Sequence, residues 1–200
     1  MTDVLPPTPE GIATAVAFLR DGAIVAFPTD TVYGVGVSTA NPDRVQALFA
    51  LKQRPAERRI PILVADTSQA ADAGFEVDER ATALADRFWP GPLTLVLPGP
   101  GASQAFRAPN HAVALELIRA SGPLFATSAN RSDEPDTLGA DEVLIAFATQ
   151  QDELAAVVDG GPSPGGVPST VVDLTVTPAR LVRAGPIGPL QIAEVVDLEP

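Results

Sequence analysis

The chain has no cysteine and only one histidine among its 200 residues. Without thiols, disulfides and thiolate-bound metals are excluded. His111 alone cannot build an imidazole-rich zinc site, whereas a Mg²⁺ ion held by carboxylates stays possible. A Ser/His/Asp triad is also excluded, because His111 follows Pro109-Asn110 and no nucleophile elbow occurs. We interpret His111 as a structural or capping residue.

Long apolar runs and a basic leader are missing as well. No segment approaches the ~20 apolar residues that span a bilayer. Residues 1–7 have neither the basic region nor the apolar core of a signal peptide. We therefore expect a cytoplasmic protein that does not bind membranes.

Positive charge is scarce: 13 Lys and Arg stand against 25 Asp and Glu, a formal net charge of −12. Nucleic-acid binding rests on phosphate neutralisation, so we expect no stable binding of nucleic acid. Four cations nevertheless fall within eight residues, namely Lys52, Arg54, Arg58 and Arg59. Such a cluster can hold a nucleoside triphosphate. The alternative is favourable charge at a helix C-terminus.

Apolar residues make up 46% of the chain, enough for a buried core, and 21 prolines with 16 glycines indicate many short connections. Their spacing predicts helices that alternate with strands, and this predicts an α/β fold with helices packed on a mixed sheet. We expect helices at 12–20, 42–52, 79–88, 111–120, 141–148 and 190–196. We expect strands at 23–27, 60–64, 93–97, 124–127, 157–158, 170–174 and 180–183.

Polar segments follow several of these strands. Residues 28–36 present hydroxyls, a carboxylate and a phenol, which suits a small polar ligand or a turn that satisfies its own backbone. Ser128 and Asn130 are either ligand contacts or an N-cap and turn. The glycine-rich segment 160–166 either covers a ligand or is a surface loop. No glycine-rich phosphate motif occurs, so a phosphate site would have to use side chains.

Seven segments, in their order along the chain, carry a family resemblance. They are Phe27–Gly36, Leu51–Pro55, Trp89–Thr94, Ser128–Asn130, Asp159–Pro162, Ser169–Asp173 and Arg183–Pro186. Together they resemble the YrdC-like family of L-threonylcarbamoyladenylate synthases, from about residue 10 to residue 187. The chain is similar to the short form of that family, and we expect residues 1–200 to be a single domain.

The resemblance implies a twisted open mixed sheet around a basic cavity. It also implies synthesis of threonylcarbamoyl-AMP and pyrophosphate from L-threonine, bicarbonate and ATP, with Mg²⁺ held mainly by ATP and water. Downstream threonylcarbamoyl transferase proteins would pass the group to position 37 of tRNA. The implied catalytic residues, which also bind ATP, are Lys52, Arg54, Ser128 and Asn130. The implied threonine contacts are Thr31, Arg107 and Thr170, and further ATP contacts are Ser103 and Arg183.

Several positions depart from the family pattern. Leu63 stands where some members have a histidine, and Asp136 stands where a serine is common. Arg58-Arg59 replaces a neutral residue and a proline. These departures keep open a paralogue with lost or altered activity that binds nucleotide or RNA. An unrelated nucleotide-dependent regulatory domain is a third hypothesis.

Overall fold

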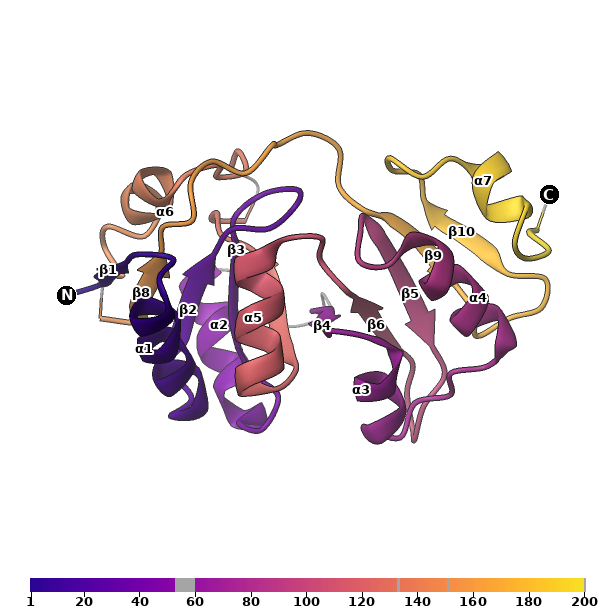
Figure 1. Cartoon of the computed structure of the whole chain (residues 1–200), viewed down its shortest axis with the longest axis horizontal. Coiled ribbons are helices and arrows are strands. Elements are labelled where there is room, and N and C mark those ends of the chain that lie inside the picture. The colour runs from indigo at the N-terminus through magenta and orange to yellow at the C-terminus, as the bar shows by residue number, and fades with distance from the viewer. Residues whose placement is uncertain (53–59, 133, 151, 200) are drawn as a thin grey trace.

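A ten-stranded mixed sheet organises the part of the chain that the structure describes (Figure 1). The computed structural model describes residues 1–52, 60–132, 134–150 and 152–199. The strand order is β1-β8-β2-β3-β7-β4-β6-β5-β9-β10. The strands are β1 (Asp3–Leu5), β2 (Ile24–Phe27), β3 (Gly34–Ser38), β4 (Ile62–Leu63), β5 (Leu93–Leu97), β6 (Gln104–Arg107), β7 (Leu124–Ser128), β8 (Leu154–Val158), β9 (Thr170–Asp173) and β10 (Arg180–Arg183).

Helices flank this sheet, so the predicted α/β class is confirmed. They are α1 (Pro9–Arg20), the 3₁₀ helix η1 (Pro42–Arg44), α2 (Val45–Lys52), α3 (Thr67–Asp72), α4 (Glu79–Phe88), α5 (Ala112–Ser121), α6 (Ala140–Ala146) and α7 (Pro189–Ala193). Asn41 precedes η1 as predicted, but its side chain does not cap the helix and donates instead to the carbonyl of Arg20.

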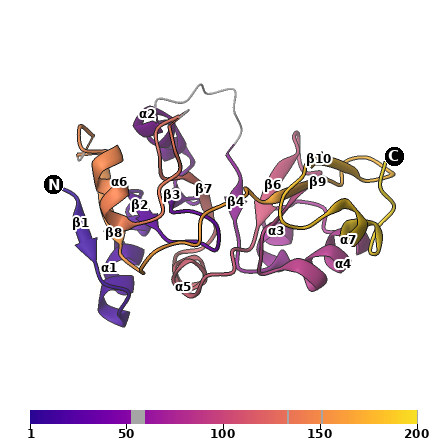
Figure 2. The ribbon, with the colours of Figure 1, turned by 90° about the horizontal axis from the view of Figure 1, so that it is seen from above.

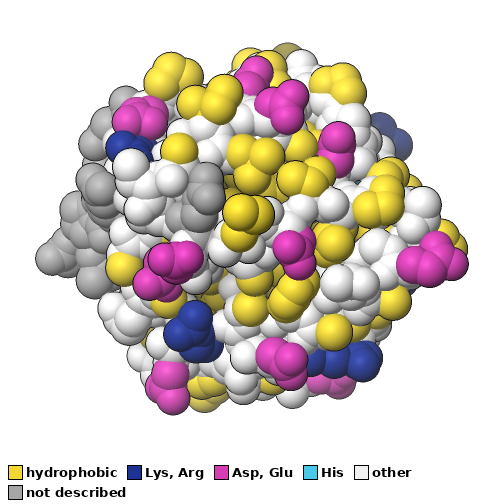
Figure 3. Space-filling model, turned by 90° about the vertical axis from the view of Figure 1, so that its left-hand side faces the viewer, with side chains coloured by type: hydrophobic (Ala, Val, Ile, Leu, Met, Phe, Trp, Pro, Cys, Tyr) yellow, Lys and Arg dark blue, Asp and Glu magenta, His cyan; other side chains and the backbone are white. Residues whose placement is uncertain are grey.

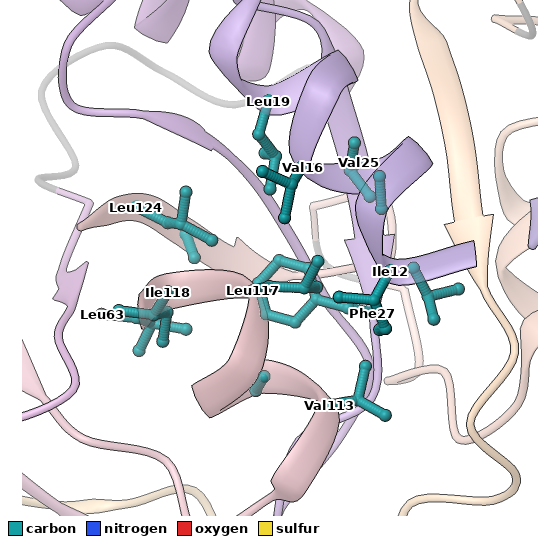
Figure 4. Packing of buried hydrophobic residues seen from close by; sticks show 14 of the residues in the cluster. Ile12, Val16, Leu19, Val25, Phe27, Leu63, Val113, Leu117, Ile118 and Leu124 are labelled. Atoms are coloured by element: carbon teal, nitrogen blue, oxygen red, sulfur yellow. The ribbon is translucent and has the colours of Figure 1, made fainter. Parts of the chain in front are cut away.

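The first half of the sheet is covered on both faces. Strand β2 is buried throughout, and its side chains alternate between two apolar clusters. Val25 and Phe27 pack in the cluster formed with α1 and α5, which Figure 4 shows from close by. Ile24 and Ala26 belong to the opposite cluster, which α2 and α6 complete. A strand buried on both faces reads as a continuous apolar run, which is why the sequence reveals it.

In the second half of the sheet, the helices that the structure describes pack on one face. Leu93, Leu95 and Leu97 of β5 pack with Phe106 of β6 in a cluster that includes residues of α3, α4 and α7. The alternate residues of these strands, such as Thr94 and Arg107, face the other way and line a cavity. The candidate site therefore lies on the face of these strands that is opposite the described helices α3, α4 and α7.

Residues 159–169, here called the strap, connect β8 in the first half with β9 in the second (Figures 1 and 2). Both views show this orange segment passing from one side of the molecule to the other. The strap is bound along its length, because the Tyr33 hydroxyl donates to the Gly161 carbonyl at 2.8 Å. The Gly165 amide donates to the Thr31 carbonyl at 2.8 Å. These contacts hold the strap against the segment that follows β2.

The surface at the β1 end mixes apolar and acidic side chains, with basic side chains at only a few points (Figure 3). Val4 on β1 and Ile145 on α6 are exposed at 53% and 76%. Within the described ranges, no helix is both long and apolar enough to span a bilayer.

Asp173 connects the last two strands. It accepts hydrogen bonds from the Thr175 amide at 2.9 Å and hydroxyl at 2.6 Å, and it pairs with Arg180 at 2.7 Å. Burial alone would raise the pKa of Asp173, but the Thr175 hydrogen bonds and the Arg180 charge outweigh it and hold that pKa below its usual value. The folded protein is therefore stabilised by the ionised carboxylate.

This pairing predicts acid sensitivity. The unfolded chain takes up a proton on Asp173 near pH 4, while the folded chain resists it. The stabilisation is thus present above about pH 4 and is lost as the pH falls through the folded pKa. Urea unfolding at stepwise lower pH should show a shallower loss of stability for Asp173→Asn than for the parent. Asp72→Asn, an exposed position on α3, is the control; equal slopes for all three proteins would contradict the prediction.

Candidate functional site

A cavity of about 390 Å³ opens where the two halves of the sheet meet. Strands β3 and β7 border it on one side, and β5, β6 and β9 on the other, with β4 between them. Its polar lining is supplied by Thr29, Thr31, Thr94, Arg107, Thr127, Ser128, Asp136, Ser169 and Arg183. Its apolar lining includes Val32, Leu63, Ala105, Pro109, Ala126 and Val171. The mixture suits a ligand with charged groups and an apolar portion.

Lys52, Ser128 and Asn130 are brought together, as the sequence predicted. Lys52 ends α2 and is only 3% exposed. Its amine donates to the Ser128 carbonyl, to the Ser128 hydroxyl at 3.3 Å and to Asn130 Oδ1 at 3.1 Å. The Ser128 hydroxyl in turn donates to Asn130 Oδ1 at 2.6 Å. Of these three residues, only Ser128 is among the described residues that line the cavity, and the buried Lys52 amine contacts it.

Backbone pairing fixes this arrangement. β7 ends at Ser128, which stands opposite Gly34 of β3. Beyond the strand, the Ala129 amide donates to the Tyr33 carbonyl at 2.8 Å. The Asn130 side-chain amide donates to the Glu134 carbonyl at 2.6 Å, which orients its oxygen toward Lys52 and Ser128. The site is therefore built at a strand end whose backbone groups are already satisfied.

Arg107 and Thr31 form a second polar group. Arg107 ends β6, and its guanidinium donates to the Thr31 hydroxyl at 3.2 Å, to the Gly91 carbonyl at 3.1 Å and to Asp30 at 2.6 Å. The Thr31 hydroxyl also lies 3.1 Å from that of Thr29. A planar guanidinium held in this way is suited to a carboxylate or phosphate ligand.

Arg183 and Ser169 form the third group, at the cavity's exposed margin. Arg183 donates through Nε to the Ser169 carbonyl at 3.0 Å and through Nη2 to the Ser169 hydroxyl at 3.1 Å. That hydroxyl also bonds with the hydroxyl of Thr94 at 2.8 Å. Burial, and the nearby charge of Arg107, lower the pKa of Arg183. The repulsion between two arginines that line the same cavity would be relieved by an anionic ligand bound between them.

Of the predicted site residues that the structure describes, Lys52 and Asn130 contact Ser128 without lining the cavity, and Thr170 and Ser103 also lie outside the lining. The Thr170 hydroxyl donates to the Ile187 carbonyl at 2.8 Å, because alternation along β9 places Thr170 on the same face as buried Val172. Ser103 precedes β6 and does not line the cavity. Arg54 and Arg58 lie outside the described residues.

Sequence reasoning missed Ser169, Thr94 and Asp30. Ser169 directly precedes Thr170, and because side chains alternate along a strand, the two residues are expected on opposite faces. That alternation was the signal that could have assigned Ser169 to the cavity. Asp30 was visible only as part of a polar segment. Nothing in the sequence alone pairs it with Arg107, which is 77 residues away.

Two positions that depart from the family pattern, Leu63 and Asp136, line the cavity. Leu63 lines the cavity from β4, directly beside Arg107 in the sheet register. Asp136 is the only acidic residue among the described residues that line the cavity. His111 precedes α5 without capping it through its side chain, and burial lowers its pKa. His111 does not line the cavity.

Comparison with known proteins agrees with this geometry. The family model Sua5/YciO/YrdC, described as telomere recombination, matches residues 17–185. A threonylcarbamoyl-AMP synthase of Bacillus subtilis is 41% identical over 98% of this chain and 59% of its own length. One of Chromohalobacter salexigens is 36% identical over 84% of this chain and 94% of its own length.

A solved structure matches as well. Pyrococcus abyssi Sua5, crystallised with L-threonine, superposes with a TM-score of 0.89 at 36% identity. The match covers 100% of this chain and 63% of the Sua5 chain. The chain thus spans less than two thirds of the Bacillus and Pyrococcus relatives. With the family model covering most of its length, the chain belongs to the Sua5/YciO/YrdC family.

Proposed function

We propose that this chain is an L-threonylcarbamoyladenylate synthase, which makes threonylcarbamoyl-AMP and pyrophosphate from L-threonine, bicarbonate and ATP. The observation that carries the proposal is the buried Lys52 amine, bonded to Ser128 and Asn130 beside a cavity that also holds Arg107 and Arg183. The names of the curated relatives support the same activity.

The chemistry requires two anions to react. The amine of L-threonine adds to the carbon of bicarbonate with loss of water, which gives a carbamate. A carbamate oxygen then bonds to the α-phosphorus of ATP, while the bond from that phosphorus to the pyrophosphate oxygen breaks. Carbamate and triphosphate repel each other, so fixed positive charge beside the α-phosphate lowers the barrier. Alignment of the reactants contributes several kcal/mol more, up to roughly 10 kcal/mol.

The roles of the residues follow from this reaction. Lys52, Arg54, Ser128 and Asn130 would hold the phosphates and the reacting carbamate. Arg107 and Thr31 would receive the threonine, with the Ser169 hydroxyl taking the contact assigned to Thr170 from the sequence. Arg183 would lie beside the nucleotide, and Ser103 remains a proposed nucleotide contact.

Magnesium would enter with ATP as part of the substrate. Within the described ranges, no group of three or more acidic, histidine or cysteine side chains could hold a metal ion. Asp136 is the one acidic group on the described cavity lining. Phosphate oxygens and water would hold most of such an ion's coordination, and Asp136 is the acidic side chain that could add a protein ligand. The ion's chemistry would be neutralisation of phosphate charge.

The partners we propose are downstream threonylcarbamoyl transferase proteins in the cytoplasm. The formal net charge of −12 supports transfer of the product to such proteins over stable binding of tRNA by this chain. The acidic side chains of the face in Figure 3 support the same view.

A mass-spectrometric assay of the purified chain tests the activity. Threonylcarbamoyl-AMP and pyrophosphate should appear only when ATP, L-threonine and bicarbonate are all present. Pyrophosphate release that persists without L-threonine would contradict the proposal and favour a different nucleotide-dependent activity. Tight, salt-sensitive binding of tRNA without product would favour an RNA-binding paralogue.

Arg54 gives a second test, based on its place two residues after Lys52. Arg54→Ala should weaken ATP binding by ~1.5–3 kcal/mol, because a charge-assisted phosphate contact is lost. Isothermal titration with a non-hydrolysable ATP analogue measures this change. Arg119→Ala, which removes an exposed cation on α5, should leave the affinity unchanged. Equal affinities for all three proteins would show that Arg54 does not contact the phosphates of ATP.

A further inference from the structure

We propose that Asp30 is a positioning residue that holds the Arg107 guanidinium in place for the carboxylate of the amino-acid substrate. The inference rests on the proposed function and adds a residue that does not itself line the cavity. Arg107 is on the cavity lining, whereas Asp30 is not, so Asp30 reaches the substrate only through Arg107.

The hydrogen bonds of Arg107 divide its donors between protein and cavity. A guanidinium carries five N–H groups. One on Nε goes to the Gly91 carbonyl, one on Nη1 to the Thr31 hydroxyl and one on Nη2 to Asp30. One hydrogen on each Nη is left without a partner in the described part of the chain. Two donors are thus available for the two oxygens of a carboxylate.

The ion pair is shielded from water. The side chains of Arg107 and Asp30 are 11% and 12% exposed, and their atoms are 2.6 Å apart. A buried cation that loses its acidic partner becomes unfavourable, and it either turns toward water or draws an anion from elsewhere. Asp30 therefore fixes where the guanidinium points, besides satisfying one of its donors.

The segment that carries Asp30 is itself rigid. The Thr29 hydroxyl donates to the Val32 carbonyl at 2.7 Å and accepts from the Thr31 amide at 3.2 Å. The Ser163 hydroxyl of the strap donates to the Thr29 carbonyl at 3.0 Å, and the Gly165 amide binds the Thr31 carbonyl. Asp30 lies between these hydrogen-bonded residues, so the position of its carboxylate is fixed and in turn fixes the position of the Arg107 guanidinium.

The ion pair also separates two regions of the cavity by charge. The charge of Arg107 is balanced by that of Asp30, and its two remaining N–H groups suit a single carboxylate. Arg183 has no acidic partner in the described part of the chain and donates only to Ser169, so it retains its charge for a phosphate. The carboxylate of the amino acid is thereby assigned to Arg107 on β6, between the proposed phosphate contacts at Ser128 on β7 and Arg183 on β10.

The test compares the parent chain with Asp30→Asn, Asp30→Glu and the exposed control Glu116→Gln. For Asp30→Asn, we expect KM for L-threonine to rise 10- to 100-fold while KM for ATP changes less than twofold. Titration calorimetry should show that preference for L-threonine over L-threoninamide, which lacks the carboxylate, falls at least tenfold. Asp30→Glu should recover part of both effects, and Glu116→Gln should match the parent.

Three outcomes separate the two proposals. If the parent neither binds nor uses L-threonine, the proposed function fails, and this inference fails with it. If the parent is active and Asp30→Asn keeps its KM and its preference for the carboxylate, only the positioning role is overturned. Equal rises in both KM values, together with a lower melting temperature, would assign Asp30 a general structural role and would also overturn the inference.

Discussion

Lys52→Met should reduce the rate of threonylcarbamoyl-AMP formation by about 10²–10³-fold, the loss typical when one fixed group that stabilises transition-state charge is removed. The Lys52 amine is the buried cation that connects the Ser128 hydroxyl and the Asn130 amide oxygen. Methionine is unbranched and only one atom shorter than lysine, and it removes the charge and the donors. Single-turnover measurement of pyrophosphate release at saturating substrates reports the loss directly.

The same substitution leaves three acceptor contacts without their donor, so some loss of stability is expected, of about 1–3 kcal/mol. Urea unfolding separates this loss from the catalytic one. Arg119→Met is the matched control, because it deletes an exposed cation from α5 and should keep the parent's rate. If Lys52→Met folds and keeps the parent's rate, the buried amine has no role in the reaction.

Gly185→Ala should lower the free energy of unfolding by about 3 kcal/mol, at the upper end of the usual cost of overpacking. A Cβ at Gly185 would lie 2.4 Å from the Thr170 amide nitrogen and 2.5 Å from the Pro168 carbonyl oxygen. Both are backbone atoms, which cannot rotate away as a side chain does. The Thr170 amide also donates to Pro92 at 2.9 Å, so relief of the clash would disturb that bond.

The clash should affect the site as well, since Gly185 follows Arg183 by two residues and its added Cβ would lie 2.7 Å from the carbonyl carbon of Ser169. We expect KM for ATP to rise in Gly185→Ala as Arg183 is displaced from its Ser169 contacts. Gly188→Ala is the control, because the nearest atom to its Cβ is 3.7 Å away, in the flexible Gln191 side chain. Similar unfolding midpoints for the two variants would show that the turn yields easily.

The sequence predicted the elements with strong apolar patterns. Helix 79–88 and strand 93–97 agree with α4 and β5 at both ends. β3 and β6 were missed: Gly34 and Gly36 weaken the pattern of β3, and β6 has a polar residue, Gln104 or Arg107, at each end. Isolated propensities cannot reveal strands whose stability comes from neighbours distant in the chain.

In the candidate site too, some contacts were predictable from the sequence and others were not. The contact of Lys52 with Ser128 and Asn130 agrees with the prediction from short motifs in a fixed order. The pairing of Asp30 with Arg107 joins the segment after β2 to the end of β6, and only the tertiary fold brings the two residues together. Thr170 and Ser169 differ by one position, and a shift of one residue along a strand exchanges the two faces of the sheet.

Lys52 is the only lysine in the chain. Because its side chain is 3% exposed, reagents that acylate primary amines will meet one accessible target in the folded protein, the N-terminus. Labelling of the second amine then measures how often α2 and the end of β7 separate, and a ligand that bridges them will slow it. Lys52 is thus a natural chemical probe at the proposed reaction site, and its labelling can be followed separately from that of the N-terminus without an engineered tag.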